Sequence, residues 1–199
     1  MKTAIAIFIG VIAFLVLNSI IPTKQECEIY NSTVRLHVIA NSDSDDDQAL
    51  KLKVRDAVLE RMSTYNATSK EQALTFIEND KSELVKTAQE CLKNEGFDYT
   101  VDIKITEEAY PTREYEDFTL PAGTYTSLKI IIGNGDGQNW WCVLYPPLCS
   151  SAAIEYDKDA SVEVGLSKDQ YNLITGSNGK YKVKLKLLEL AAEAFGLDY

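Results

Sequence analysis

Apolar and polar positions follow a changing period along the first half of the chain. Residues 34–40 alternate at first and are rich in β-branched side chains, a pattern typical of a strand. From Gln48 onward apolar residues recur every three or four positions, which predicts a helix with one buried face. A second run with helical spacing follows Ser69 and ends at Gly96. Ser69 and Gln72, three residues apart, have the spacing of a capping box at its start. The pattern predicts one strand followed by two helices.

Beyond Gly96 the spacing of apolar residues changes from the three-to-four-residue repeat of a helix to the two-residue repeat of a strand. Residues 99–106 alternate strictly, as in a strand that is solvated on one face. Residues 124–132 and 139–145 are two further β-rich runs, joined by a glycine-rich segment that favours a hairpin loop. The run 139–145 is almost wholly apolar, so we expect a central strand covered on both faces and ended by Pro146-Pro147.

Two helices placed between an early strand and later strands indicate the α+β class. We expect a single domain in which a mostly antiparallel sheet packs against two helices. Near the end of the chain, residues 180–187 alternate with lysines and predict an edge strand, followed by a short helix over 188–195. The expected organisation is a signal peptide or membrane anchor at 1–21, a tether at 22–33, the α+β domain at 34–165, and a C-terminal extension at 166–199.

An almost uninterrupted apolar run covers residues 4–21 and precedes the predicted fold. As a helix it would span roughly 27 Å, close to the thickness of a bilayer core. Lys2 lies before the run, whereas Lys24 after it is offset by Glu26 and Glu28, so we expect the rest of the chain to be exported. No small-residue cleavage motif follows the run, so a cleaved signal peptide and an uncleaved anchor both stay open.

The overall composition fits a globular domain. The chain has 199 residues, of which 45% are hydrophobic and 25% charged. Its net charge of -10 argues against nucleic acid as a partner, because phosphate binding requires clustered Lys and Arg.

The spacing Asp43-x-Asp45-x-Asp47 is similar to the start of a calcium-binding loop. A complete loop would require Gly where Gln48 stands and Glu where Val54 stands. Carboxylates at a helix N-terminus, where they bind free amides and oppose the helix dipole, explain the pattern better. We therefore expect neither a metal nor a cofactor.

His37 is the single histidine, so a catalytic thiol would have to be Cys142 or Cys149 acting with it. No nucleophile motif supports that pair, and we assign no catalytic residue. Four cysteines allow three pairings in an exported domain. A bridge between Cys142 and Cys149 is favoured because the proline turn can bring them together, and two reduced core thiols are the alternative.

Two stretches resemble a known family. They are "RLHVIANSDSDDDQALKLKVRDAVL" at 35–59 and "LPAGTYTSLKIIIGNGDGQNWWCVLYPPLC" at 120–149, and both are similar to stage II sporulation protein R. The resemblance runs from about residue 34 to 149. It implies a protein that is made in the forespore, exported into the space between the two membranes, and needed to activate a membrane-embedded protease. That protease processes the precursor of a mother-cell sigma factor. The resemblance implies a protein ligand rather than an enzyme, with no small-molecule substrate.

The expected contact surface is chosen on physical grounds. Polar residues at a strand-to-helix turn stay exposed on a rigid frame, and aromatic residues often anchor interfaces. Neighbouring tryptophans on one strand point to opposite faces, so one is core and the other a candidate anchor. An exported cell-wall binding module or hydrolase is the alternative function. The candidate contact residues are Arg35, Asn41, Ser42, Asp43, Asp45, Trp140, Trp141 and Tyr145.

Overall fold

The computed structural model describes residues 23–115, 118–148 and 167–175, together with the isolated residues 3, 7, 10 and 14. It divides into two compact units. One comprises residues 1–29, 109–123 and 168–199, and the other comprises residues 30–108 and 124–167.

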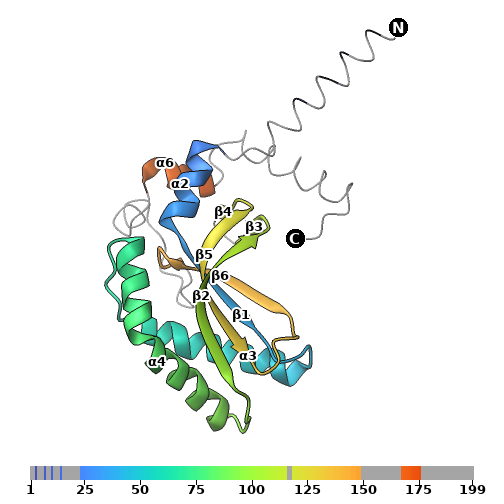
Figure 1. The fold of residues 1–199 in the computed structure, drawn as a ribbon, viewed down its shortest axis with the longest axis vertical. Coiled ribbons are helices and arrows are strands. Elements are labelled where there is room, and N and C mark those ends of the chain that lie inside the picture. The colour runs from blue at the N-terminus through green and yellow to red at the C-terminus, as the bar shows by residue number, and fades with distance from the viewer. Residues whose placement is uncertain are drawn as a thin grey trace. The chain divides into compact units, whose positions relative to one another are not determined.

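The second unit is built on a four-stranded sheet in the order β2-β5-β1-β6 (Figure 1). Strand β1 runs parallel to β5 and antiparallel to β6. The sheet is therefore mixed rather than mostly antiparallel as predicted, while the α+β class is confirmed. The strands are β1 (Val34–Ile39), β2 (Val101–Tyr110), β5 (Gly123–Ile132) and β6 (Asn139–Tyr145).

The predicted hairpin between β5 and β6 is wrong, because β1 lies between them. The loop that joins them passes over the end of β1, where the N–H of Gly137 donates to the carbonyl of Ala40 at 3.0 Å. Among the strands that the structure describes, β6 consequently lies at the edge of the sheet and is not a central strand. Its apolar composition reflects side chains such as Trp140 and Leu144, which pack against the core although the strand lies at the edge.

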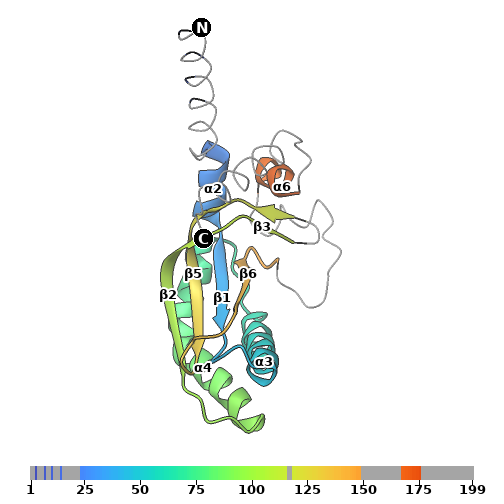
Figure 2. The same cartoon turned by 90° about the vertical axis from the view of Figure 1, so that its right-hand side faces the viewer.

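Two helices, α3 (Asp45–Met62) and α4 (Lys70–Asn94), pack against each other and against β1 (Figure 2). This part of the predicted architecture is confirmed. Every second residue of β1 joins the helices in one apolar core, because side chains alternate between the two faces of a strand. The fully buried members include Val34, Leu36 and Val38 from β1, Val54 and Val58 from α3, Leu84 and Leu92 from α4, and Leu128 and Ile130 from β5.

Both long helices carry caps that the local sequence supplies. The Oγ of Ser69 accepts from the N–H of Gln72 at 3.2 Å, as predicted. Ser44 plays the same part for α3, so this helix begins three residues before the predicted start at Gln48. At the end of α4, Gly96 adopts a φ of 83° and the N–H of Phe97 donates back to the carbonyl of Leu92, which forms a Schellman motif.

The segment expected to be a tether contains a helix, α2 (Lys24–Ser32). Thr23 and Glu26 form a reciprocal capping box there, since the N–H of Glu26 donates to the Oγ1 of Thr23 at 3.2 Å and the N–H of Thr23 donates to the carboxylate of Glu26. Ile29 is fully buried. The unit that includes most of α2 also contains β3 (Arg113–Glu114), which pairs with β4 (Thr119–Leu120), and helix α6 (Lys168–Ile174), none of which was predicted.

Several predictions fall on other parts of the chain. The strand at 180–187, the helix at 188–195 and almost all of the apolar run 4–21 lie outside the described residues. Within the described residues, no helix combines the length and apolar character needed to span a bilayer.

Candidate interaction surface

Residues 41–47 connect β1 to α3 and include the first turn of that helix; we call them the acidic turn. Hydrogen bonds between their own side chains hold the turn in place. The carboxylate of Asp47 is only 3% exposed. It accepts hydrogen bonds from the Nδ2 of Asn41 at 2.8 Å and from the Oγ of Ser42 at 2.5 Å. Burial on its own would raise the pKa of Asp47, but hydrogen bonds led by those from Ser42 and Asn41 outweigh it and lower the pKa. The turn is therefore organised around a buried, ionised carboxylate.

The connection between β5 and β6, residues 133–138, docks onto this turn; we call it the glycine loop. The N–H of Asn134 donates to the Oδ1 of Asn41 at 3.0 Å, and the N–H of Gln138 donates to the Oδ1 of Asp43 at 2.7 Å. Two side chains of the turn thus accept hydrogen bonds from backbone donors of the loop, so the loop and the turn are linked at two points.

Two glycines allow this close approach. Gly133 has a φ of 57°, and a Cβ added there would lie 2.2 Å from the Oδ1 of Asn41. A Cβ at Gly137 would lie 2.3 Å from the carbonyl oxygen of Ser42. The acidic turn and the glycine loop consequently form one interlocked body, in which Asn41, Ser42 and Asp43 have structural roles in addition to any contact with a partner.

Four carboxylates remain exposed around this body, and we call them the acidic rim: Asp43, Asp45, Asp46 and Asp136. Asp45 and Asp46 lie in the first turn of α3, where negative charge opposes the positive end of the helix dipole. In the part of the chain that the structure describes, no three His, Cys, Asp or Glu side chains are grouped to hold a metal ion. The rim presents concentrated negative charge on a frame with little freedom to move.

Arg35 does not lie at the turn, and the prediction that it is exposed is wrong. It is 0% exposed and is the second residue of β1. Its Nε donates to the carbonyl oxygen of Cys142 at 3.0 Å, and its guanidinium lies 5.2 Å from the ring centre of Tyr125. Arg35 therefore joins neighbouring strands inside the fold.

The aromatic residues of β6 separate onto the two faces, as predicted for the tryptophans. Trp140 pairs with Val38 and packs against the helix-side core, with the guanidinium of Arg55 4.6 Å from its ring centre. Trp141 lies on the opposite face, 5.6 Å from the ring of His37, and is half-buried. Tyr145 is only 4% exposed, so the expectation that it forms part of the surface is wrong. Trp141 is the aromatic candidate for contact on the sheet face that points away from α3 and α4.

His37 belongs to a polar network on the same sheet face, away from α3 and α4. Its Nδ1 lies 3.1 Å from the Oε2 of Glu108, and its Nε2 lies 2.8 Å from the Oδ1 of Asn139. The Nζ of Lys129 donates to the Oε1 of Glu108 at 2.6 Å. Burial would raise the pKa of Glu108, but the hydrogen bonds from Lys129 and His37 lower it overall. Sequence reasoning missed Glu108 and Lys129. Lys129 carries a signal, because it is the single charged residue of β5, whereas Glu108 is one of four charged residues of β2 and does not stand out.

The structure does not bring Cys142 and His37 together. Cys142 pairs with Leu36 and shares its face of the sheet, whereas His37 pairs with Trp141 on the other face. Cys142 is disulfide-bonded, and Cys27 and Cys91 are free thiols. Cys149 lies outside the described residues, so its pairing with Cys142 stays a prediction. A hydrolase built on Cys142 and His37 therefore lacks its central contact.

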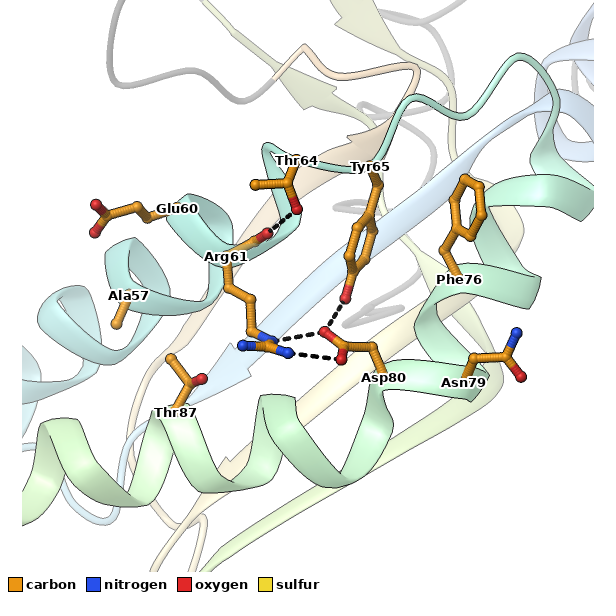
Figure 3. Close-up of a pocket in the computed structure, with 9 residues that line it drawn as sticks. All are labelled: Ala57, Glu60, Arg61, Thr64, Tyr65, Phe76, Asn79, Asp80 and Thr87. Atoms are coloured by element: carbon orange, nitrogen blue, oxygen red, sulfur yellow. Dashed lines mark hydrogen bonds and ion pairs between the residues drawn. The ribbon is translucent and has the colours of Figure 1, made fainter.

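A shallow groove of 660 Å³ lies between α3 and α4 (Figure 3). At its centre Arg61 donates two hydrogen bonds to Asp80, at 2.6 and 2.7 Å, and the hydroxyl of Tyr65 donates to the same carboxylate at 2.5 Å. The hydrogen bonds from Arg61 and Tyr65 outweigh burial and lower the pKa of Asp80. Arg61, Tyr65 and Asp80 thus bind one another and connect the two helices across the groove.

Comparison with known proteins places the chain in a family. The sequence model described as stage II sporulation protein R matches residues 30–155, more than half of the chain. The protein named "Stage II sporulation protein R" from Bacillus subtilis (strain 168) is 41% identical over 128 residues, which cover 63% of this chain and 57% of that protein. The chain thus aligns with little more than half the length of this relative. No solved structure matches. The matched region contains the acidic turn, the glycine loop and both long helices, and the chain belongs to the stage II sporulation protein R family.

Proposed function

We propose that this chain is an exported signalling protein of sporulation that activates a membrane-embedded protease from the space between the forespore and mother-cell membranes. The protease would process the precursor of a mother-cell sigma factor. Family membership supports a role in stage II of sporulation, and the family is named for a stage of development rather than for a reaction. The apolar run at 4–21 supports export, followed either by release or by anchoring in the membrane.

The observation that carries the proposal is the acidic rim on its interlocked frame. Asp43 is held in place by the N–H of Gln138, and the turn beneath is fixed by the buried carboxylate of Asp47. A surface ordered before binding loses little conformational freedom when a partner docks. Exposed carboxylates select a basic partner surface and accelerate encounter with it, an effect that the net charge of -10 strengthens.

A protein ligand of this kind acts by shifting the equilibrium of the protease between its inactive and active forms. It activates the protease only if it binds the active form more tightly than the inactive form. The rim would therefore contact basic groups of the protease that are better placed in its active form. The half-buried ring of Trp141, on the sheet face away from α3 and α4, is a second candidate contact.

The test compares two triple variants of the full chain in sporulating cells of its own species. Asp45→Asn/Asp46→Asn/Asp136→Asn removes three rim charges. Glu78→Gln/Glu83→Gln/Glu90→Gln removes three exposed charges from α4 and is the matched control, because the net charge changes equally. Conversion of the sigma-factor precursor is followed by immunoblot, and the protease that copurifies with each variant is measured.

We expect the rim variant to lose precursor conversion and protease capture while the α4 variant retains both. Thermal unfolding of the two purified variants establishes that each is folded. Equal conversion and capture with both variants would reject the acidic rim as the contact surface. Turnover of cell-wall fragments by the wild-type chain without any protease capture would favour the cell-wall alternative instead.

A further inference from the structure

The outer edge of β2 carries charged residues whose order is complementary to that of a second, antiparallel copy of the same edge. Strand β2 lies at one end of the sheet, opposite β6 (Figure 2). In the part of the chain that the structure describes, no strand pairs with this outer edge. The side chains of Asp102 and Lys104 are 59% and 50% exposed, and they form an ion pair with each other at 2.6 Å. Val101, Ile103 and Ile105 point to the opposite face, toward the helix-side core.

Backbone geometry shows which groups of β2 point outward. The carbonyl of Thr100 accepts from the N–H of Gly133 at 2.9 Å, next to the end of β5, so it points into the sheet. Successive residues of a strand direct their N–H and C=O groups to alternate sides. Val101, Ile103 and Ile105 therefore present their backbone donors and acceptors at the open edge.

These constraints select one symmetric pairing. In an antiparallel pair centred on Ile103, this residue lies opposite its own copy and Val101 lies opposite Ile105, each as a hydrogen-bonded pair. Asp102 then lies opposite Lys104 of the second copy, and the reverse pair forms at the same time. Both are non-hydrogen-bonded pairs, in which opposing side chains are closest. Moving the centre by one residue in either direction places Asp102 opposite Asp102 or Lys104 opposite Lys104.

We propose that a second copy of this chain pairs with the edge of β2 in this register, so that the two sheets continue into each other across a two-fold axis. The contact is isologous, because the same edge serves both partners. Charged side chains on an edge strand can instead serve to prevent pairing, which is the alternative that the experiment addresses. The proposal concerns self-association alone and does not depend on the function proposed above.

The test measures self-association of the full chain by sedimentation equilibrium in a density-matched detergent. Asp102→Lys and Lys104→Asp each place like charges opposite one another, and they change the net charge in opposite directions. Because each substitution affects two symmetric pairs, we expect either one to weaken the dimer roughly tenfold. The exchange variant Asp102→Lys/Lys104→Asp restores opposite charges and should return to wild-type affinity. A wild-type chain that stays monomeric, or three variants that associate as the wild type does, would overturn the proposal.

A crosslinking experiment checks the register in a chain whose free thiols are removed by Cys27→Ser and Cys91→Ser. Chains with Asp102→Cys and chains with Lys104→Cys are oxidised separately and as a mixture. In the proposed register Cβ atoms of directly opposite residues are about 4.5–5.5 Å apart, and diagonal neighbours are farther apart. The mixture should therefore form a covalent dimer much faster than either chain alone. Equal rates in all three samples would contradict this register.

Discussion

The backbone N–H of Gln138 donates to the Oδ1 of Asp43 at 2.7 Å, although 95 positions separate the two residues in sequence. This hydrogen bond links the glycine loop to the acidic turn, which lie within the two stretches that carry the family resemblance. It places Asp43 in a structural role as well as on the acidic rim, so a substitution of Asp43 affects stability and contact together.

Replacing Asp43 with Ala should lower the free energy of unfolding by about 1 kcal/mol, because the N–H of Gln138 loses its acceptor. Asp45→Ala is the control, since Asp45 is exposed and the effect should remain within about 0.5 kcal/mol. Urea unfolding of the two variants measures both values. Equal stability of the two would show that the link between turn and loop contributes nothing measurable.

Gly137→Ala should be much more destabilising than Gly96→Ala. The new Cβ at position 137 meets the backbone carbonyl of Ser42, which cannot move without disturbing the turn, and we expect a loss of about 3 kcal/mol. Gly96 has a φ of 83° but open space around it, so only the conformational cost of about 1 kcal/mol applies. Thermal midpoints of the two variants provide the comparison. A larger loss at Gly96 would contradict the close packing of loop and turn.

Arg35→Ala should cost roughly 3 kcal/mol, since it removes a fully buried guanidinium that bonds Cys142 and packs on Tyr125. Arg55→Ala, which removes a cation–π contact with Trp140, should cost about 1 kcal/mol. Chemical denaturation measures both losses. Loss of protease binding in an Arg35 variant would therefore indicate unfolding rather than a lost contact. A stable Arg35→Ala variant would require a different account of this buried charge.

Glu108 should make stability depend on acid pH. The pKa of Glu108 is lowered in the folded state because hydrogen bonds from Lys129 and His37 outweigh its burial. A lowered folded-state pKa contributes stability that is present above the unfolded-state pKa, about 4.3, and is lost as the pH falls through the folded-state pKa. The stability difference between wild type and Glu108→Gln should accordingly shrink below about pH 4. Urea unfolding between neutral and acid pH measures it, with exposed Glu78→Gln as the control. A difference that is constant across this range would contradict the prediction.

Local patterns were sufficient for the elements whose residues interact with near neighbours in sequence. The cap at Ser69, the end of α4 at Gly96 and the alternation of β2 all depend on contacts a few residues apart. The family resemblance also rests on stretches that are continuous in sequence. The helix at 24–32 was not predicted although Thr23 and Glu26 have capping-box spacing, because a short segment of mixed charge is also typical of a tether.

Pairing across the sheet could not be obtained in this way. Strand periodicity shows which residues share a face, but it does not show which strands are neighbours. A glycine-rich segment between two β-rich runs can form the turn of a hairpin. It can equally well form a loop that passes over the end of a third strand. Because β1 lies between β5 and β6, β6 is at the edge of the described sheet and not in the centre, where it was predicted.

Amino-acid patterns were enough to predict the α+β class, the two long helices, the strand that precedes them and the resemblance to the family. The tertiary structure alone decided that Arg35 is buried, that His37 contacts Glu108 and Asn139 instead of Cys142, and that Asp43 holds the glycine loop. The physical reason is the range of the interactions. Helix periods and caps act within a few residues, whereas the position of a polar side chain in a sheet depends on strands that lie far apart in the chain.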